Sequence, residues 1–360
     1  MSDSHHLPAI KGRGANHAGL SRRFDDKLRE ADGDWLDARD GIDGEGPRLR
    51  TEVTIEHPRT IINRNRSPDL PFDHSINAYR GCEHGCIYCF ARPTHAYHNL
   101  SPGLDFETRL FAKPDAAALL RKELAKPGYR CSPIAMGTNT DPYQPIEGRF
   151  RITRAVVEVL AEHDHPLVIT TKSARIMRDI DLLAPMAAKG LAAVMMSVTT
   201  LDSALARRME PRASTPGRRI AAIAALAKAG VPTSISVSPI VPGINDHEIE
   251  ALVAAGAEAG ARAAFSIVVR LPHEVAPLFR EWLAVHYPDR AAKVMALINA
   301  MRGGRDNNPD FFDRFRPEGA YAASLQTRFR IVCRKYRLNA ERFVARTDLF
   351  RVPTDQLSLF

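Results

Sequence analysis

The sequence predicts an α/β protein, a partial TIM-type (β/α)6 barrel with a helical C-terminal extension and a flexible N-terminal tail. Continuous apolar segments alternate with helical patterns along the middle of its 360 residues, which is typical of a parallel sheet covered by helices. About six such units fit within roughly 200 residues, whereas a closed eight-stranded barrel usually needs ~250. An open barrel therefore fits better, and functional groups are expected at the C-terminal ends of its strands.

The apolar segments define the strands, and the patterns between them define the helices. The predicted strands are 74–79, 132–138, 167–172, 191–200, 231–240 and 262–271. The predicted helices are 151–163, 175–189, 217–230, 247–260 and 273–285, and two of them end at a glycine, as a C-terminal cap prefers. Residues beyond 288 are expected to be helical, including 321–338. We therefore expect a tail over 1–55, the barrel over 56–288, and a helical extension over 289–360 packed on the barrel.

The N-terminal segment and the charge balance bear on partners. Residues 1–50 are rich in Gly, Asp, Arg and His with little apolar periodicity, which favours a flexible tail. Its basic segment KGRG (11–14) could fold onto the barrel or onto a polyanion. Lys and Arg number 50 against 42 Asp and Glu, a net charge of +8. This excess suits an anionic partner such as nucleic acid, although basic residues spread along a chain also fit an ordinary basic surface.

Two absences in the sequence bear on location. The apolar stretches fall short of the ~20 residues that span a bilayer. The N-terminus, MSDSHHLPAI, lacks the apolar core of an export signal. We therefore expect a cytoplasmic protein with no membrane partner.

Three of the five cysteines, Cys82, Cys86 and Cys89, fall within eight residues in the pattern C-x3-C-x2-C. Clustered thiols in a reducing compartment indicate metal binding rather than disulfides. Three thiolates on so short a loop can hold three corners of a 4Fe–4S cluster. The fourth iron then has no protein ligand and is free to bind a small molecule. Gly81 and Gly85 allow the backbone to turn tightly around the sulfurs.

Two other metal sites and the remaining cysteines need consideration. Zinc would need a fourth ligand such as His84, His95 or His98, and zinc loops usually carry a second C-x2-C pair, which this sequence lacks. An Fe–S electron-transfer or sensor protein would also need a fourth protein ligand, with His84 as the candidate. Cys131 and Cys333 are isolated and are predicted to be buried core thiols.

The loop YRGCEHGCIYCF (79–90) resembles the signature of the radical S-adenosylmethionine (SAM) superfamily. Several further segments resemble a spore photoproduct lyase-like, DNA repair photolyase-like subgroup, and the resemblance spans about residues 60–340. They are KGRG (11–14), GTNTDPYQPIE (137–147), ITTKS (169–173), SVTTLD (197–202), MEPR (209–212) and SPIVPGIND (238–246).

The resemblance implies an enzyme with a 4Fe–4S cluster and SAM as cofactors. Such an enzyme cleaves SAM reductively and uses the 5′-deoxyadenosyl radical to abstract hydrogen from a substrate. The substrate is left open, with nucleic acid as a candidate, and so is a lyase-type or transferase-type outcome. An external reductant such as flavodoxin or ferredoxin is implied, and a monomer is expected. The competing hypotheses are an Fe–S electron-transfer or sensor protein and a nucleic-acid binding module without radical chemistry.

By this resemblance the three cysteines are the metal ligands, and polar groups at successive strand ends bind SAM. Those implied for the methionine part are Gly137, Thr138, Asn139, Asp141 and Lys172. Those implied for the ribose are Ser197 and Thr199, with Glu210 and Arg212 binding ribose or carboxylate or forming a structural ion pair. Ile240 is expected on the adenine side, Tyr88 on a ligand near the cluster, and Arg270 at the substrate mouth. Turn formation, core packing and a solvated rim are the alternative roles for these residues.

One position limits the analogy with spore photoproduct lyase. That enzyme returns a hydrogen atom from a cysteine, and the motif comparison places Thr138 near that position. A hydroxyl does not donate a hydrogen atom as readily as a thiol. The sequence therefore predicts radical formation without assigning lesion cleavage, and it leaves the residue that acts on the substrate unassigned.

Overall fold

The computed structural model describes residues 10–17, 19 and 49–353, and its centre is one seven-stranded sheet. The strand order is β10-β9-β8-β7-β6-β3-β2, in which β2 pairs antiparallel with β3 and every other neighbouring pair is parallel. The strands are β2 (Ile62–Arg64), β3 (His74–Ile76), β6 (Ile134–Met136), β7 (Leu167–Thr171), β8 (Ala192–Ser197), β9 (Thr233–Ile240) and β10 (Ala263–Val268). Six parallel strands in an open sheet confirm the predicted partial barrel.

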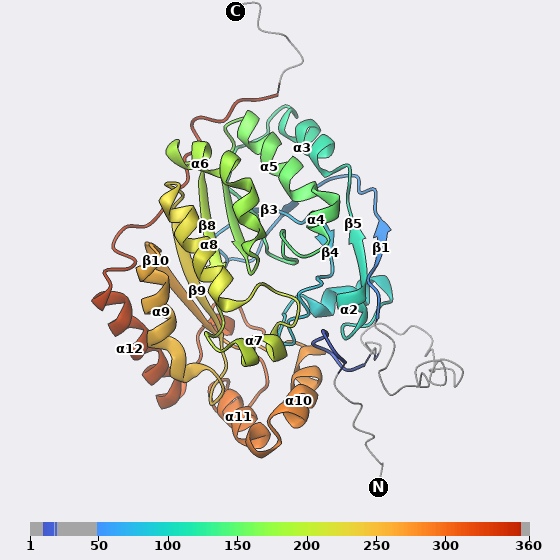
Figure 1. The fold of residues 1–360 in the computed structure, drawn as a ribbon. Helices are drawn as coiled ribbons and strands as arrows, with labels where there is room; N and C mark the ends of the chain where they lie inside the picture. The colour runs from blue at the N-terminus through green and yellow to red at the C-terminus, as the bar shows by residue number, and fades with distance from the viewer. Residues whose placement is uncertain (1–9, 18, 20–48, 354–360) are drawn as a thin grey trace, which may run out of the picture.

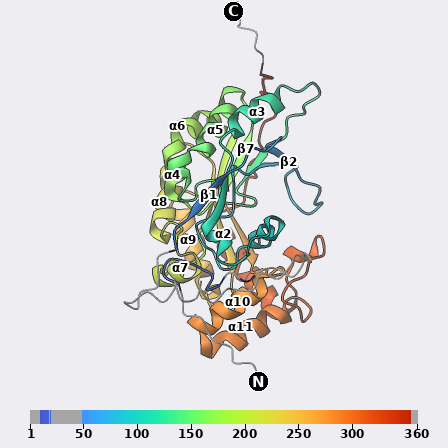
Figure 2. The ribbon, with the colours of Figure 1, turned by 90° about the vertical axis from the view of Figure 1, so that its right-hand side faces the viewer.

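Helices cover one side of this sheet, as Figures 1 and 2 show. The turned view places α4, α5, α6 and α8 together on that side, and α10 and α11 lie below the sheet in both views. α12 packs against α9 and β10. These helices are α4 (Glu147–Phe150), α5 (Ile152–Glu162), α6 (Ile180–Ala188), α8 (Pro216–Lys228), α9 (Ile249–Glu258), α10 (Val275–His286), α11 (Pro288–Ala300) and α12 (Gly319–Lys335).

A small second sheet is formed by strands on both sides of the cysteine loop in the chain. It joins β1 (Glu52–Ile55), β5 (Arg109–Ala112) and β4 (Tyr79–Arg80), with β1 parallel and β4 antiparallel to β5. The predicted strand 74–79 is therefore split between two sheets, because β3 ends at Ile76 and β4 begins at Tyr79. The change of sheet directs the chain out of the barrel just before Cys82. The remaining short elements are α2 (Asp105–Thr108), α3 (Ala116–Leu124), α7 (Ser203–Met209), and the 3-10 helices η1 (Arg92–His98), η2 (Ala174–Asp179), η3 (Asp246–Glu248) and η4 (Asp313–Phe315).

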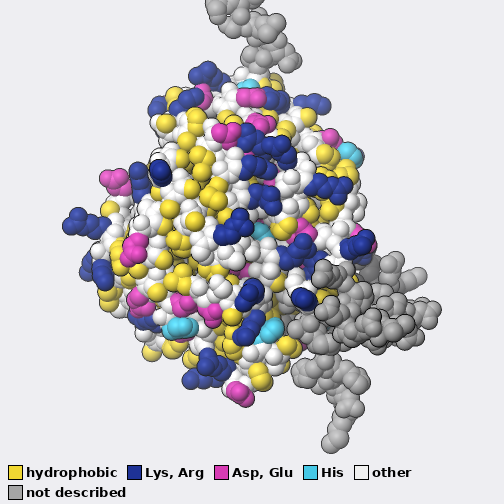
Figure 3. Space-filling view, viewed as in Figure 1, with side chains coloured by type: hydrophobic (Ala, Val, Ile, Leu, Met, Phe, Trp, Pro, Cys, Tyr) yellow, Lys and Arg dark blue, Asp and Glu magenta, His cyan; other side chains and the backbone are white. Residues whose placement is uncertain are grey.

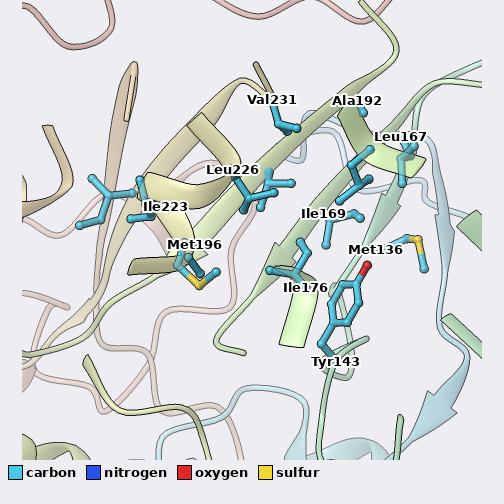
Figure 4. Packing of buried hydrophobic residues seen from close by; sticks show 14 of the residues in the cluster. Met136, Tyr143, Leu167, Ile169, Ile176, Ala192, Met196, Ile223, Leu226 and Val231 are labelled. Atoms are coloured by element: carbon cyan, nitrogen blue, oxygen red, sulfur yellow. The ribbon is translucent and has the colours of Figure 1, made fainter. Parts of the chain in front are cut away.

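The core lies between the sheet and the helices that cover it. Figure 4 shows Ile223 and Leu226 of α8 packed near strand residues such as Ile169 and Met196, all of them fully buried. Burying one such side chain contributes about 1.5–3 kcal/mol. The core therefore fixes the strand ends, where the predicted polar residues stand. Within the described part of the chain, no helix combines the length and apolarity needed to cross a bilayer.

Gly137, directly after β6, provides a test of how closely two strands approach. Its φ is +90°, and a Cβ there would lie 2.0 Å from the backbone oxygen of Thr170 in β7. We expect Gly137→Ala to lower the free energy of unfolding, measured by urea denaturation, more than Gly128→Ala. Gly128 also has a positive φ, +78°, but nothing lies within 4 Å. The control should lose about 1–2 kcal/mol and Gly137→Ala a further 1–3 kcal/mol. Equal losses would contradict the close approach.

Candidate cluster and cofactor site

The cysteine loop turns twice at glycines that cannot be replaced without displacing neighbours. Gly81 and Gly85 have φ of +71° and +66°. A Cβ on Gly81 would lie 2.8 Å from the backbone oxygen of Phe106, and one on Gly85 would lie 2.7 Å from a carboxylate oxygen of Glu107. The loop therefore presses closely against the segment 104–110, and its turns are set by steric contact.

The three thiols are gathered in a largely dry environment. Cys82 and Cys86 are buried and Cys89 is half-buried. Burial, the largest influence, raises the pKa of each thiol, and neighbouring thiols raise the pKa of Cys82 and Cys86 further. Such thiols stay protonated until a metal takes the place of the proton.

Backbone amides face two of the sulfurs. The Asp141 amide lies against the sulfur of Cys82, and the amides of Ala91 and Arg92 lie against that of Cys89. Amide donors to thiolate sulfur are a device by which proteins tune iron–sulfur clusters. Two buried thiols and one half-buried thiol with these donors fit a cluster in which each sulfur binds a different iron. Among the described residues, no group of three or more His, Cys, Asp or Glu side chains is placed so that it could hold one metal ion.

The histidines considered as a fourth ligand are engaged with the protein. His84 is buried, and its Nδ1 lies 3.4 Å from a carboxylate oxygen of Asp141. His95 Nε2 lies 2.9 Å from the backbone oxygen of Arg109. The His98 ring lies 4.9 Å from that of Phe111. These contacts hold all three rings to the protein around the loop.

A fully buried ion pair holds the loop from behind. Arg92 and Glu107 are both 0% exposed, and their charged groups approach to 2.5 Å. Arg92 donates its remaining hydrogen bonds to four backbone oxygens, those of Gly85, Cys86, Pro102 and Gly103. A buried guanidinium is tolerated because its donors are all used this way. The carbonyl groups of the cysteine loop are thereby fixed in direction.

Residues 10–17 complete this arrangement from the N-terminus. The amides of Gly14 and Ala15 each donate to the Glu107 carboxylate over 2.9 Å, and Arg13 donates to the Glu107 backbone oxygen. A Cβ on Gly14 would lie 1.8 Å from the backbone oxygen of Gly85. Residues 13–16 are buried. The sequence left open whether KGRG folds onto the barrel or onto a polyanion, and residues 13–16 pack on the cysteine loop. Residues 1–9, 18 and 20–48 of the predicted tail lie outside the described residues.

A second cluster of polar side chains gathers around Glu210. This buried carboxylate accepts from Thr199 Oγ1 over 2.6 Å and from the Tyr88 hydroxyl. It pairs with the buried Arg219 and lies 3.6 Å from Lys172 Nζ. Burial opposes ionisation, but the two cations and the hydrogen bonds prevail and lower the pKa of Glu210 to about 2. Glu210 is therefore a carboxylate held between two cations.

Lys172 connects this cluster with the next strand end. Its Nζ donates to Ser197 Oγ over 2.5 Å and lies 5.7 Å above the centre of the Tyr88 ring. Ser197 Oγ in turn donates to the backbone oxygen of Ser238, near the C-terminal end of β9, and Thr199 Oγ1 lies 3.1 Å from the same oxygen. Five of the residues predicted for the cofactor therefore form one connected group: Tyr88, Lys172, Ser197, Thr199 and Glu210.

The GTNTD segment forms a neighbouring group. Thr138 Oγ1 lies 3.3 Å from the amide nitrogen of the Asn77 side chain, and the Asn139 amide donates to Asn77 Oδ1 over 3.1 Å. Asp141 accepts from Thr171 Oγ1 and from the Lys172 amide, both over 2.7 Å, and faces His84. Burial opposes ionisation of Asp141, yet His84 and these donors lower its pKa. Asp141 therefore ties the end of β7 to the cysteine loop.

Two predicted residues lie apart from this group, and one member was missed. Arg212 pairs with Glu83 over 2.9 Å rather than with Glu210, and Ile240 is buried in the main core. Arg219 supplies the cation for Glu210 instead. Nothing in the sequence signals this, because Arg219 follows Arg218 in the first turn of a predicted helix, where arginines are ordinarily exposed.

Comparison with known proteins places this geometry in context. A family model described as the radical SAM superfamily matches residues 76–255. A protein of Mycobacterium tuberculosis, described as uncharacterized, is 38% identical over 230 residues, 63% of this chain and 68% of that protein. One from Methanocaldococcus jannaschii, also described as uncharacterized, is 28% identical over 199 residues, 55% of this chain and 71% of that protein.

Solved structures of spore photoproduct lyase share the fold. The lyase complexed with dinucleoside spore photoproduct is 18% identical with a TM-score of 0.55, covering 82% of this chain and 84% of that one. A mutant with bound AdoMet and dinucleoside spore photoproduct is 17% identical with a TM-score of 0.53, covering 79% of each chain.

The Arg92–Glu107 pair yields a stability prediction for the protein without cofactor. Glu107→Gln leaves the Arg92 guanidinium buried beside a neutral amide, which should lower the free energy of unfolding by about 3–5 kcal/mol. Glu250→Gln is the matched control, because Glu250 pairs with Arg328 on the surface and exposed pairs contribute about 1 kcal/mol or less. Denaturation of both variants measures the difference. Similar small losses would show that the buried pair does not hold the loop.

Proposed function

This chain belongs to the radical SAM superfamily, and we propose that Cys82, Cys86 and Cys89 hold a 4Fe–4S cluster through which it cleaves SAM reductively. The observation that carries the proposal is that the loop holding the three thiols is joined to the cluster of polar side chains around Glu210. The Tyr88 hydroxyl donates to Glu210, and the Ile87 amide donates to the backbone oxygen of Met209 over 3.1 Å. When bound, the iron–sulfur cluster would supply the electron that breaks a C–S bond of SAM and leaves a 5′-deoxyadenosyl radical. Such a radical would abstract hydrogen from the substrate.

We assign the carboxylate of the methionine part to Lys172. Its ammonium group is already within 3.6 Å of Glu210, but that carboxylate is compensated by Arg219 as well. Two cations facing one anion leave a surplus positive charge, which an incoming carboxylate would neutralise through charge-assisted hydrogen bonds. The hydroxyls of Ser197 and Thr199 are then the groups for ribose oxygens. Tyr88 packs against the same ligand through its ring.

The GTNTD segment is assigned to the methionine amino group. Gly137 lets this turn approach β7, and Thr138 and Asn139 present side-chain oxygens as acceptors for an ammonium. Asp141 is a positioning residue in this proposal, because both of its oxygens are already used by Thr171, the Lys172 amide and His84. Arg212 is the structural ion-pair partner of Glu83, and Ile240 is packed in the main core, so neither residue is assigned to SAM here.

We further propose nucleic acid as the substrate class. Arg270, just after β10, lies 4.6 Å from the centre of the Phe315 ring, and Arg314 lies about equally close to the rings of Phe311 and Phe315, at 5.0 and 5.1 Å. Phe311 is 52% exposed. Exposed aromatic rings beside arginines are the usual platform for unpaired bases. Spore photoproduct lyase, which shares this fold, has been solved in complex with a dinucleoside spore photoproduct, and this supports nucleic acid as the substrate class.

This proposal does not extend to lesion cleavage by the route of the lyase. Thr138 hydrogen-bonds with Asn77 and carries no thiol that could return a hydrogen atom. Hydrogen abstraction from a nucleic acid is therefore proposed without that second step.

Radical formation is tested by product analysis after anaerobic reconstitution with iron and sulfide. With dithionite and SAM, the wild type should release 5′-deoxyadenosine and hold about four irons per chain. Alanine at Cys82, Cys86 or Cys89 should abolish the product and most of the iron. Cys131→Ala and Cys333→Ala are controls that keep both, since neither belongs to the loop. Undiminished product from the three loop variants would refute the assignment.

The substrate class is tested by fluorescence anisotropy with a labelled single-stranded oligonucleotide. Phe311→Ala removes one exposed ring and should weaken binding by about 1–3 kcal/mol, roughly 5- to 150-fold. Val344→Ala is a matched control, because Val344 is also exposed but stands near the C-terminus. Equal affinities of Phe311→Ala and wild type, or no binding at low salt, would count against nucleic acid.

A further inference from the structure

A cleft of about 200 Å³ opens on the outer side of the cysteine loop. It lies among the segments that follow β6, β7 and β8. Its lining consists of His84, Tyr143, Pro145, Ser173, Arg175, Arg212, Ala213, Ser214 and Arg218. None of the proposed SAM-binding side chains belongs to that lining. The cleft is therefore a separate approach to the same loop.

The floor of this cleft belongs to the segment that carries the thiols. His84 stands between Cys82 and Cys86 in the chain, is only 2% exposed, and lines the cleft. Its ring is held by Asp141, and the neighbouring Glu83 is held by Arg212 of the cleft wall. A molecule seated here would lie close to His84, between Cys82 and Cys86 in the chain. Such closeness favours electron transfer to anything bound by that loop.

The charge of the cleft is one-sided. Its described lining contains three arginines and no Asp or Glu. Arg212 is neutralised by Glu83, but within residues 10–17, 19 and 49–353 the guanidinium groups of Arg175 and Arg218 form no ion pair, and both are exposed. α8 begins at Pro216 beside them, so the positive end of its dipole adds to the field. Figure 3 shows Lys and Arg side chains gathered in a band down the middle of this face.

We propose that this cleft is the docking surface for a small acidic electron-transfer protein that reduces the cluster. The proposal rests on the proposed function, which consumes one electron for each SAM cleaved. In this step the redox centre of the donor loses one electron and the cluster gains it. No bond is formed or broken, and no proton is transferred. Complementary charge speeds such encounters and makes them sensitive to salt.

Two observations favour a protein donor here over a nucleic acid. The cleft contains two ring side chains, Tyr143 and His84, and both are buried. Neither ring therefore offers an exposed surface on which a base could stack. The exposed ring proposed for bases, Phe311, stands in another part of the chain. The cleft therefore matches an acidic surface better than an unpaired strand.

The test is a double charge reversal, Arg175→Glu/Arg218→Glu, compared with wild type and with Arg330→Glu/Arg334→Glu. The control pair lies on α12, where both arginines are exposed. Affinity for a bacterial flavodoxin is measured by calorimetry at low salt, on protein with and without cluster. We expect at least tenfold weaker binding in the cleft variant, no change in the control, and an affinity in wild type that falls steeply with salt.

Two rates separate docking from chemistry. Reduction of the cluster by photoreduced flavodoxin, followed by absorbance in a stopped-flow instrument, should slow at least tenfold in the cleft variant. Formation of 5′-deoxyadenosine driven by dithionite should stay at the wild-type level, because dithionite needs no docking surface. Loss of dithionite-driven product in wild type would instead overturn the proposed function.

Other outcomes overturn the docking proposal itself. They are an unchanged flavodoxin affinity in the cleft variant, or wild type that binds neither flavodoxin nor a 4Fe–4S ferredoxin. Weakened binding of a single-stranded oligonucleotide with unchanged flavodoxin binding would assign the cleft to nucleic acid. Arg175→Gln/Arg218→Gln guards against a variant that folds poorly, and it should weaken flavodoxin binding by a smaller factor. Unchanged affinity in this folded variant also overturns the proposal.

Discussion

The buried ion pair of Arg92 and Glu107 is the interaction on which the candidate site depends. Burying two charged groups costs free energy unless they pair with each other and all their hydrogen bonds are made. Here the hydrogen-bonding partners belong to the cysteine loop or to segments packed against it. The guanidinium fixes the carbonyls of Gly85 and Cys86, while the carboxylate takes the amides of Gly14 and Ala15. The conformation of the cysteine loop is thus set by contacts with the rest of the protein.

Around Glu210, too, a buried carboxylate is paired with cations, but here two cations face one carboxylate. Glu210 is ionised because Arg219 and Lys172 both approach it, so the local sum of charge is positive. Arg219 also donates hydrogen bonds to the backbone oxygens of Ser197 and Ser214. It is therefore fixed, whereas Lys172 Nζ makes one hydrogen bond, to Ser197, with longer contacts to Glu210 and to the Tyr88 ring. This difference makes Lys172 the cation able to turn toward a ligand.

Local patterns in the sequence predicted the parts of this account that depend on neighbouring residues. The six parallel strands follow from apolar segments of five or more residues, and the cysteine loop from three thiols within one short segment. The small sheet of β1, β4 and β5 was not predicted, because its strands are two to four residues long and pair across distant segments. Arg92, Glu107 and Arg219 were missed for the same reason. Their partners are distant in sequence, so residue spacing does not reveal them. For KGRG, composition left open whether the segment folds onto the barrel or onto a polyanion.

The central claim is that the three thiols leave one iron open and that SAM chelates it beside Lys172. Electron–nuclear double resonance of the reduced, reconstituted protein tests this claim most directly, with SAM labelled by ¹⁵N at the amino group and by ¹⁷O at the carboxylate. Our account predicts hyperfine coupling of both labels to the cluster, and a weaker ¹⁷O coupling or weaker SAM binding in Lys172→Ala. An intact cluster whose spectrum shows no coupling to either label would contradict it.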